Sequence, residues 1–377
     1  MSHKMKNLAP YQLFFPLGLL NAVLAVGVWF VQHLGWFNSP AILIHSKLIM
    51  GGFLWSFIVG FLMTAIPRMT ATSSASKVEY TFALLFLLGL TSFAWQVDAR
   101  FFYGNQILLT LFLLVYGIRR ILKMGKPLPV FFSHVGIAMV LALTGSYYYF
   151  IGNSMMGIHL YHVGTVLLLV LGIGTRFFSF LSGLPSSFEN TTSFLHRMTF
   201  HVAGILVGGL LFLAGLGISV SYLGISLLSL VYLFAIWQVQ RPSARPSALK
   251  YAVRIVAAMI PLSFFLAWLQ PLMFVTWLHL LFIGCFALIT FAVATRVILA
   301  HGSYAIEMEM KSRASWLLVS FLVLAVIFRV AYGFSNGFFK TSFLHLAATF
   351  WMIAVISWCA AFLRRIFKPG PQIKPSC

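Results

Sequence analysis

The sequence predicts an all-α polytopic membrane protein with about twelve transmembrane helices and both termini in the cytoplasm. Three observations predict this fold class. The 377 residues are 61% hydrophobic and only 8% charged, which is more apolar surface than a soluble domain can bury. Apolar runs of about 20 residues, long enough to cross a hydrocarbon core, recur along the whole chain. All but four of the 25 Lys and Arg residues fall on one side of the predicted membrane.

Each apolar run must form a helix, because lipid offers no hydrogen-bond partners to an open backbone. The first run follows Lys4 and Lys6, as a signal peptide would, but its length and the topology favour a retained helix. Short turns containing Pro, Gly, Asn or Ser separate the runs, so we expect a single integral membrane domain over residues 1–377. The predicted helices span residues 11–31, 41–66, 79–96, 101–121, 129–151, 156–182, 196–216, 218–239, 250–268, 272–300, 313–334 and 341–365.

The basic residues predict the orientation of these helices. With the N-terminus inside, only Lys47, Arg100, Arg329 and Lys340 fall in the outer half, and an odd helix count would destroy this asymmetry. The net charge of +20 is therefore explained by topology rather than by a nucleic-acid partner. The expected partner of this charge is the lipid bilayer, through anionic lipid of the inner leaflet.

Five histidines are predicted to lie in the outer third of the bilayer, on four different helices. Polar side chains inside a membrane are costly and are usually retained for function. Neutral imidazole is also a common ligand of metals and of haem iron. We therefore predict a shared metal or haem site, with hydrogen-bonded packing or interfacial anchoring as the alternative for each residue alone. The five histidines are His45, His159, His162, His279 and His345.

Two cations are predicted at a similar depth, Lys47 and Arg329, and neither has a carboxylate nearby in the sequence. Their functional interpretation is that they bind the propionates of haem by charge-assisted hydrogen bonds. The alternative is that they extend toward the outer membrane surface. Four further histidines lie at predicted inner helix ends, where contact with water explains them: His134, His196, His201 and His301.

An internal repeat relates two of the histidine-bearing helices. His159 precedes Arg176 by 17 residues, and His279 precedes Arg296 by the same 17 residues. The helix that starts with His45 shows a weaker version of this pattern. We infer three four-helix units in a pseudo-threefold arrangement, over approximately residues 11–121, 129–239 and 250–365. The arginines are interpreted as anchors at the level of the lipid phosphates, with a second, inner site as the alternative.

Several segments resemble the NnrS family. His279, Gly284, Thr295-Arg296 and His301-Gly302 are similar to one of its motifs, and the segment from Gly60 to Pro67 is similar to another. The resemblance implies a bacterial inner-membrane protein that contains haem, with b-type haem expected, and copper, linked to nitric oxide stress and denitrification. The chain departs from the family pattern where Lys47 replaces a histidine and Leu48 replaces a glutamate. Such a member can keep haem and lose copper.

The predicted arrangement of three four-helix units also resembles, more distantly, subunit I of haem–copper oxidases. In that superfamily the seventh helix adds a histidine pair near the outer side. Here the corresponding histidines, His196 and His201, are predicted on the inner side. A complete binuclear reductase centre is therefore not expected, and whether the chain turns over a substrate is left open.

The leading hypothesis is a haem-binding membrane protein, with His45 and His279 as axial ligands and Lys47 and Arg329 at the propionates. His159, His162 and His345 are candidates for a second metal or haem. Nitric oxide or another diatomic molecule would be the ligand, and the electron partner is unknown. The alternative is a transporter of metal ions or small molecules without haem. A proton-coupled mechanism is disfavoured, because the five acids occur at helix ends or in loops: Glu79, Asp98, Glu189, Glu307 and Glu309.

Overall fold

The computed structural model describes residues 8–36, 40–125, 128–182, 193–242, 247–305 and 307–368, in which no residue is in a β-strand. Glu189 lies outside these residues. The helices are α1 (Pro10–His33), α2 (Ala41–Lys47), η2 (Leu48–Leu54), α3 (Trp55–Thr70), α4 (Lys77–Phe93), α5 (Ala99–Ile121), α6 (Phe132–Phe150), α7 (Ser154–Gly157), η3 (Ile158–Gly164), α8 (Thr165–Ser182), α9 (Phe194–Gly215), α10 (Val220–Tyr232), η4 (Leu233–Trp237), α11 (Ala248–Leu269), η5 (Pro271–Met273), α12 (Phe274–Leu281), η6 (Phe282–Ala287), α13 (Leu288–His301), α14 (Glu307–Lys311), α15 (Arg313–Phe334) and α16 (Gly337–Phe367).

The all-helical fold class is confirmed, and each predicted helix has a counterpart with ends shifted by no more than about four residues. Within the described residues, ten helices are long and apolar enough to cross a membrane. Two of the twelve predicted membrane helices correspond to helices outside this set of ten. They are α4, which has only 17 residues, and α6, which is more polar because it carries His134 and three consecutive tyrosines. The count of twelve crossings, the orientation and the three-unit arrangement therefore stay predictions.

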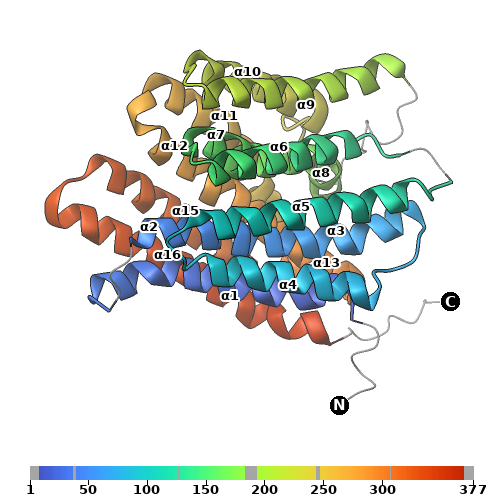
Figure 1. Cartoon of the computed structure of the whole chain (residues 1–377), viewed down its shortest axis with the longest axis horizontal. Coiled ribbons are helices and arrows are strands. Elements are labelled where there is room, and N and C mark those ends of the chain that lie inside the picture. The colour runs from blue at the N-terminus through green and yellow to red at the C-terminus, as the bar shows by residue number, and fades with distance from the viewer. Residues whose placement is uncertain are drawn as a thin grey trace. The chain divides into compact units, whose positions relative to one another are not determined.

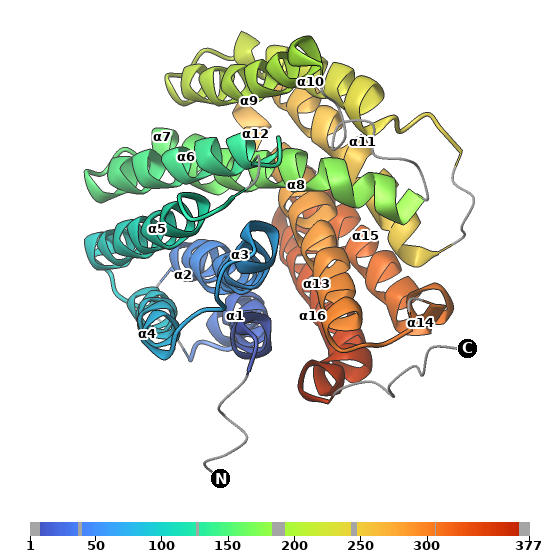
Figure 2. The ribbon, with the colours of Figure 1, turned by 90° about the vertical axis from the view of Figure 1, so that its right-hand side faces the viewer.

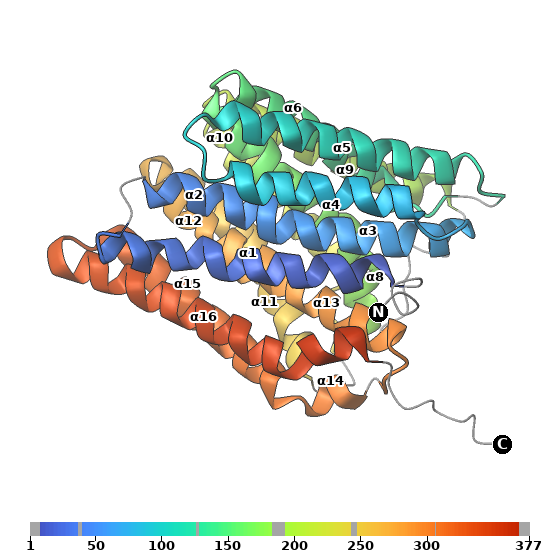
Figure 3. The ribbon, with the colours of Figure 1, turned by 60° about the horizontal axis from the view of Figure 1, so that its bottom comes forward.

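The chain divides into two compact units. Unit 1 comprises residues 1–128, 293–318 and 351–377. In this unit α1 packs along α3 and η2, and α4 packs against α5 (Figures 1 and 3). Gln12 at the start of α1 donates a hydrogen bond to the carbonyl oxygen of Ile366 at the end of α16, at 2.6 Å. The first helix therefore begins on the side of unit 1 where the last helix ends.

Unit 2 comprises residues 129–292 and 319–350. Here α6 packs against η3 and α8, and α9 packs against η3 and α10. The series continues through α10 to α11 and from α11 to α12, and Figure 2 shows α9, α10 and α11 lying together. This packing gathers the starts of η3, α10 and α12 at one end of the unit.

Polar residues mark several helix starts, as their capping chemistry requires. Asp98 precedes α5 and accepts a hydrogen bond from the backbone N–H of Arg100 at 2.9 Å. The Arg100 side chain also pairs with this carboxylate, and their hydrogen bonds hold the pKa of Asp98 below its usual range. Asn153 and Ser247 cap the starts of α7 and α11 in the same way.

Glycine permits a close contact between η2 and α1 in unit 1. A Cβ added to Gly52 would lie 2.5 Å from Cγ of Asn21, whose amide is held by the Leu17 carbonyl. Small residues at such contacts let membrane helices approach closely. In contrast, a Cβ added to Gly209 on α9 meets no atom within 4 Å.

We expect Gly52→Ala to destabilise the protein by about 1–3 kcal/mol, because the added methyl group overpacks the contact with Asn21. The matched control is Gly209→Ala, which is expected to leave stability unchanged or slightly raised. Thermal unfolding of both variants in detergent measures the difference. Equal melting temperatures for the two variants would contradict the packing described for η2.

Candidate metal- or haem-binding site

Each of the three helices that carry His45, His159 and His279 contains a π-helical segment. Leu48, the first residue of η2, is the third residue after His45, and Phe282, the first residue of η6, is the third after His279. In the third helix, His159 lies within η3 itself. A π-helical turn widens the backbone and is frequent at functional sites. The hydropathy pattern did not predict these segments.

His45 lies on α2 in unit 1 and is partly buried. Its Nδ1 lies 2.8 Å from the carbonyl oxygen of Ala25 on α1, and its ring contacts Trp29 at a centroid distance of 5.4 Å. A carbonyl oxygen can only accept, so Nδ1 is the protonated nitrogen. This tautomer carries its lone pair on Nε2, the nitrogen that can bind a metal.

His279 lies on α12 in unit 2 and has the same tautomer. Its Nδ1 donates to the carbonyl oxygen of Val275, one turn earlier on the same helix, at 2.7 Å. The ring is partly exposed and meets Phe282 edge-on at a centroid distance of 5.6 Å. The two predicted axial ligands are therefore both held in the form suited to iron.

His159 is fully buried and engages both ring nitrogens within unit 2. Nδ1 donates to the carbonyl oxygen of Met155 at 2.8 Å, so Nε2 accepts a hydrogen bond from the Tyr222 hydroxyl at 2.7 Å. The ring also stacks on Phe274, the first residue of α12, at 6.0 Å and 17°. To bind a metal, His159 would have to give up its bond to Tyr222.

His162 lies on the same π-helical segment and differs from His159 in one respect. Its Nδ1 pairs with the Tyr149 hydroxyl at 2.7 Å, but its Nε2 is buried and has no hydrogen-bond partner among the described residues. Leaving a buried polar atom unpaired costs about 1–3 kcal/mol. Nε2 of His162 is thus a nitrogen to which a ligand would add a missing interaction.

The two predicted propionate-binding cations differ in their surroundings. Lys47 is 4% exposed and donates to the carbonyl oxygens of Ala94 and Gln96, which follow α4. Arg329 on α15 lies over the ring of Tyr332 at 4.7 Å, and its Nη1 is buried without a hydrogen-bond partner in the described part of the chain. Lys47 therefore holds the end of α4, whereas Arg329 retains a donor for an anion.

The remaining candidate, His345, is partly buried on α16 in unit 2. Unit 2 thus contains His159, His162, His279, Arg329 and His345, while unit 1 contains His45 and Lys47. No group of three or more His, Cys, Asp or Glu side chains in the described ranges is arranged to hold a metal ion. A haem iron needs only one or two protein ligands, so the candidates remain suited to it.

A second histidine cluster lies at α6 and α9, where the sequence analysis expected contact with water. The structure instead buries His134 fully, and Nε2 of His134 has no hydrogen-bond partner among the described residues. Its ring packs on Phe200 at a centroid distance of 4.1 Å. Ser133 lies between it and His201, with Oγ 2.7 Å from Nδ1 of His201. Sequence position alone gave no sign of this burial.

Arg296 is not the lipid anchor that the repeat suggested. It is 8% exposed and forms an ion pair with Glu309, which is 2% exposed on the short helix α14. Its neighbour Thr295 accepts a hydrogen bond from the indole of Trp358 at 2.9 Å. These contacts attach α14 and α16 to α13 within unit 1.

This ion pair predicts a pH dependence of stability. Burial raises the pKa of Glu309 from its ordinary value of 4.5 to about 7, although Arg296 lowers it in part. The folded protein therefore binds this proton more tightly, and the contribution of Glu309 to stability falls as pH rises from about 4.5 to 7. We expect Glu309→Gln to remove this contribution to the decrease of stability with rising pH.

Melting temperatures of the wild type and of Glu309→Gln between pH 4.5 and 8 measure the difference. Glu307→Gln, a change at an exposed neighbour, is the control and should keep the wild-type slope. If the Glu309 variant has the same pH profile as the wild type, the carboxylate does not titrate in this range.

Residues 8–369 match the NnrS protein family. The match covers nearly the full sequence and includes every candidate ligand. No curated protein matches the chain.

Proposed function

We propose that this chain, which belongs to the NnrS family, is a haem-binding protein of the bacterial inner membrane that acts in the response to nitric oxide. The helices long and apolar enough to cross a membrane support the multi-pass location. In this proposal the haem lies in the outer half of the bilayer and is held by histidines, with b-type haem as the cofactor.

The observation that carries the proposal is the tautomer shared by His45 and His279. Each donates Nδ1–H to a backbone carbonyl oxygen, at 2.8 Å and 2.7 Å, and so presents Nε2 as the basic nitrogen. The hydrogen bond also orients the ring and raises its basicity, as it does for metal-binding histidines in general. We therefore assign these two residues as the first axial ligands.

His162 is our next candidate ligand, ahead of His159 and His345. Its Nε2 is buried and unpaired among the described residues, whereas Nε2 of His159 is occupied by Tyr222. In the proposed site Tyr149 fixes the His162 ring through Nδ1. Arg329 binds a propionate through its unpaired Nη1. Lys47, which belongs to the other unit, holds the end of α4 through the carbonyl oxygens of Ala94 and Gln96.

A bound haem would supply an iron centre for electron transfer or for the binding of nitric oxide or another diatomic molecule. The chain's own residues orient the imidazoles, neutralise the propionates and exclude water. Copper is a second metal in this proposal, although Lys47 and Leu48 occupy the positions at which the family motif has a histidine and a glutamate.

Replacing both first-choice ligands tests the assignment. We expect His45→Ala, His279→Ala to abolish the Soret band of the purified protein, and His162→Ala to weaken or shift it if that residue binds iron. His196→Ala is the matched control, because His196 is exposed at the start of α9 and should leave the spectrum unchanged.

A full Soret band in the double variant would show that these ligands are wrong. A wild-type protein without haem absorbance that still accumulates metal ions in vesicles would favour the alternative function, a metal-ion transporter.

A further inference from the structure

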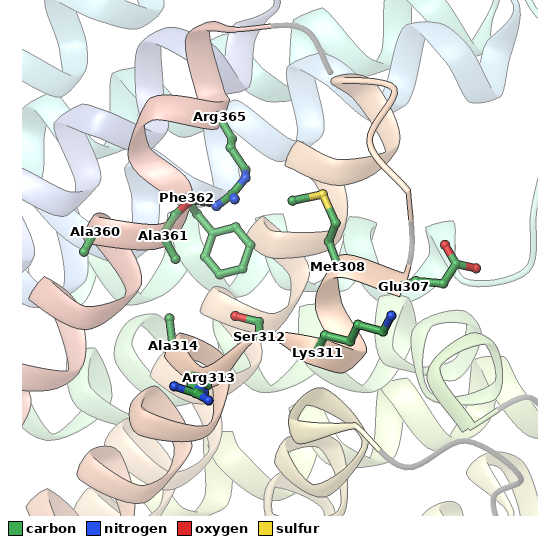
Figure 4. Close-up of a pocket in the computed structure, with 10 residues that line it drawn as sticks. All are labelled: Glu307, Met308, Lys311, Ser312, Arg313, Ala314, Ala360, Ala361, Phe362 and Arg365. Atoms are coloured by element: carbon green, nitrogen blue, oxygen red, sulfur yellow. Dashed lines mark hydrogen bonds between the residues drawn. The ribbon is translucent and has the colours of Figure 1, made fainter. Parts of the chain in front are cut away.

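A groove of about 560 Å³ opens in unit 1 between α14, the start of α15 and the end of α16 (Figure 4). Three cations line it, Lys311, Arg313 and Arg365, together with one carboxylate, Glu307. Figure 4 shows that Lys311 and Arg365 come from different helices, with Phe362 and Met308 between them. The lining therefore combines a net positive charge with apolar side chains.

Among the described residues, the three cations of the groove form no ion pair. The ion pairs formed by the described residues involve other arginines and other carboxylates, not Lys311, Arg313 or Arg365. Arg365 donates to the Ala361 carbonyl oxygen and lies over the Phe362 ring, while Lys311 and Arg313 are exposed. Cations in this state attract an anion, and guanidinium groups match the geometry of phosphate oxygens.

The start of α15 adds to this preference. Arg313 is the first residue of a 22-residue helix, and the Ser312 hydroxyl accepts the backbone N–H of Ser315 at 3.2 Å. The N-terminal end of a helix carries a partial positive charge and is a common site for anions. Here that end lies in a groove which already holds three cationic side chains.

The apolar part of the lining indicates what the anion is attached to. Met308 and the alanines Ala314, Ala360 and Ala361, which are exposed or half-buried, supply surface for a hydrocarbon chain. Both α15 and α16 are long and apolar enough to cross a membrane, and the groove lies at the first turn of one and the last turn of the other. Such a position coincides with the level of lipid headgroups.

We propose that this groove binds the phosphate of an anionic phospholipid, with Lys311, Arg313 and Arg365 around the headgroup and Met308 against the start of an acyl chain. No histidine lines the groove, so the proposal holds whether or not the protein binds haem. Glu307 is exposed and reduces the net charge of the groove to +2, which still favours an anionic headgroup.

The test compares lipid binding by full-length variants in detergent. Lys311→Gln, Arg313→Gln, Arg365→Gln removes the three groove cations, and Arg119→Gln, Lys123→Gln, Arg364→Gln removes the same charge outside the groove. Native mass spectrometry with added phosphatidylglycerol measures the affinity, and phosphatidylcholine serves as the neutral lipid. We expect the groove variant to bind phosphatidylglycerol at least about tenfold more weakly, and the control variant to bind it as the wild type does.

Equal affinity of the groove variant and the wild type would overturn the proposal. If inorganic phosphate binds the wild type as tightly as phosphatidylglycerol and displaces it, the groove is a site for a soluble phosphate and the lipid assignment is wrong. If the triple variant does not fold, the single changes Lys311→Gln and Arg313→Gln, both at exposed positions, carry the same test with a smaller expected loss.

Discussion

The fold depends on the requirement that every backbone polar group inside a membrane find its partner within the protein. This requirement makes each apolar run a helix and also explains how the helices accommodate irregular backbone. The π-helical segments η2, η3 and η6 replace ordinary helical hydrogen bonds with longer-range ones and leave the chain continuous. The wider turns occur beside His159 and His279 on the two helices that the repeat relates, and beside His45 on the helix with the weaker pattern.

The same requirement makes the buried polar side chains informative. Most are engaged: His159 by Met155 and Tyr222, Lys47 by two carbonyl oxygens, and Glu309 by Arg296. Among the described residues, 14 buried side-chain nitrogen and oxygen atoms have no hydrogen-bond partner, and two of them, Nε2 of His162 and Nη1 of Arg329, belong to candidate haem-binding residues. A haem has complementary groups, because its iron accepts an imidazole nitrogen and its propionates accept guanidinium hydrogen bonds.

The helices were predictable from sequence because hydropathy and the need for internal hydrogen bonds leave few alternatives. The histidine and arginine spacing also identified the helices that carry the candidate ligands. The π-helical segments were not predictable, since their residues have no periodicity of their own. The burial of His134 and Arg296 was also missed, because both stand near helix ends where contact with water is the ordinary expectation. Their burial depends on contacts with other helices: α9 for His134 and α14 for Arg296.

The central claim is that imidazoles of this chain bind haem iron. An ultraviolet–visible spectrum of the purified wild-type protein, recorded oxidised and reduced and paired with iron and copper analysis, tests it most directly. The account predicts a Soret band that shifts on reduction, together with stoichiometric iron. A folded protein that is colourless and free of iron after expression with ample haem would contradict it.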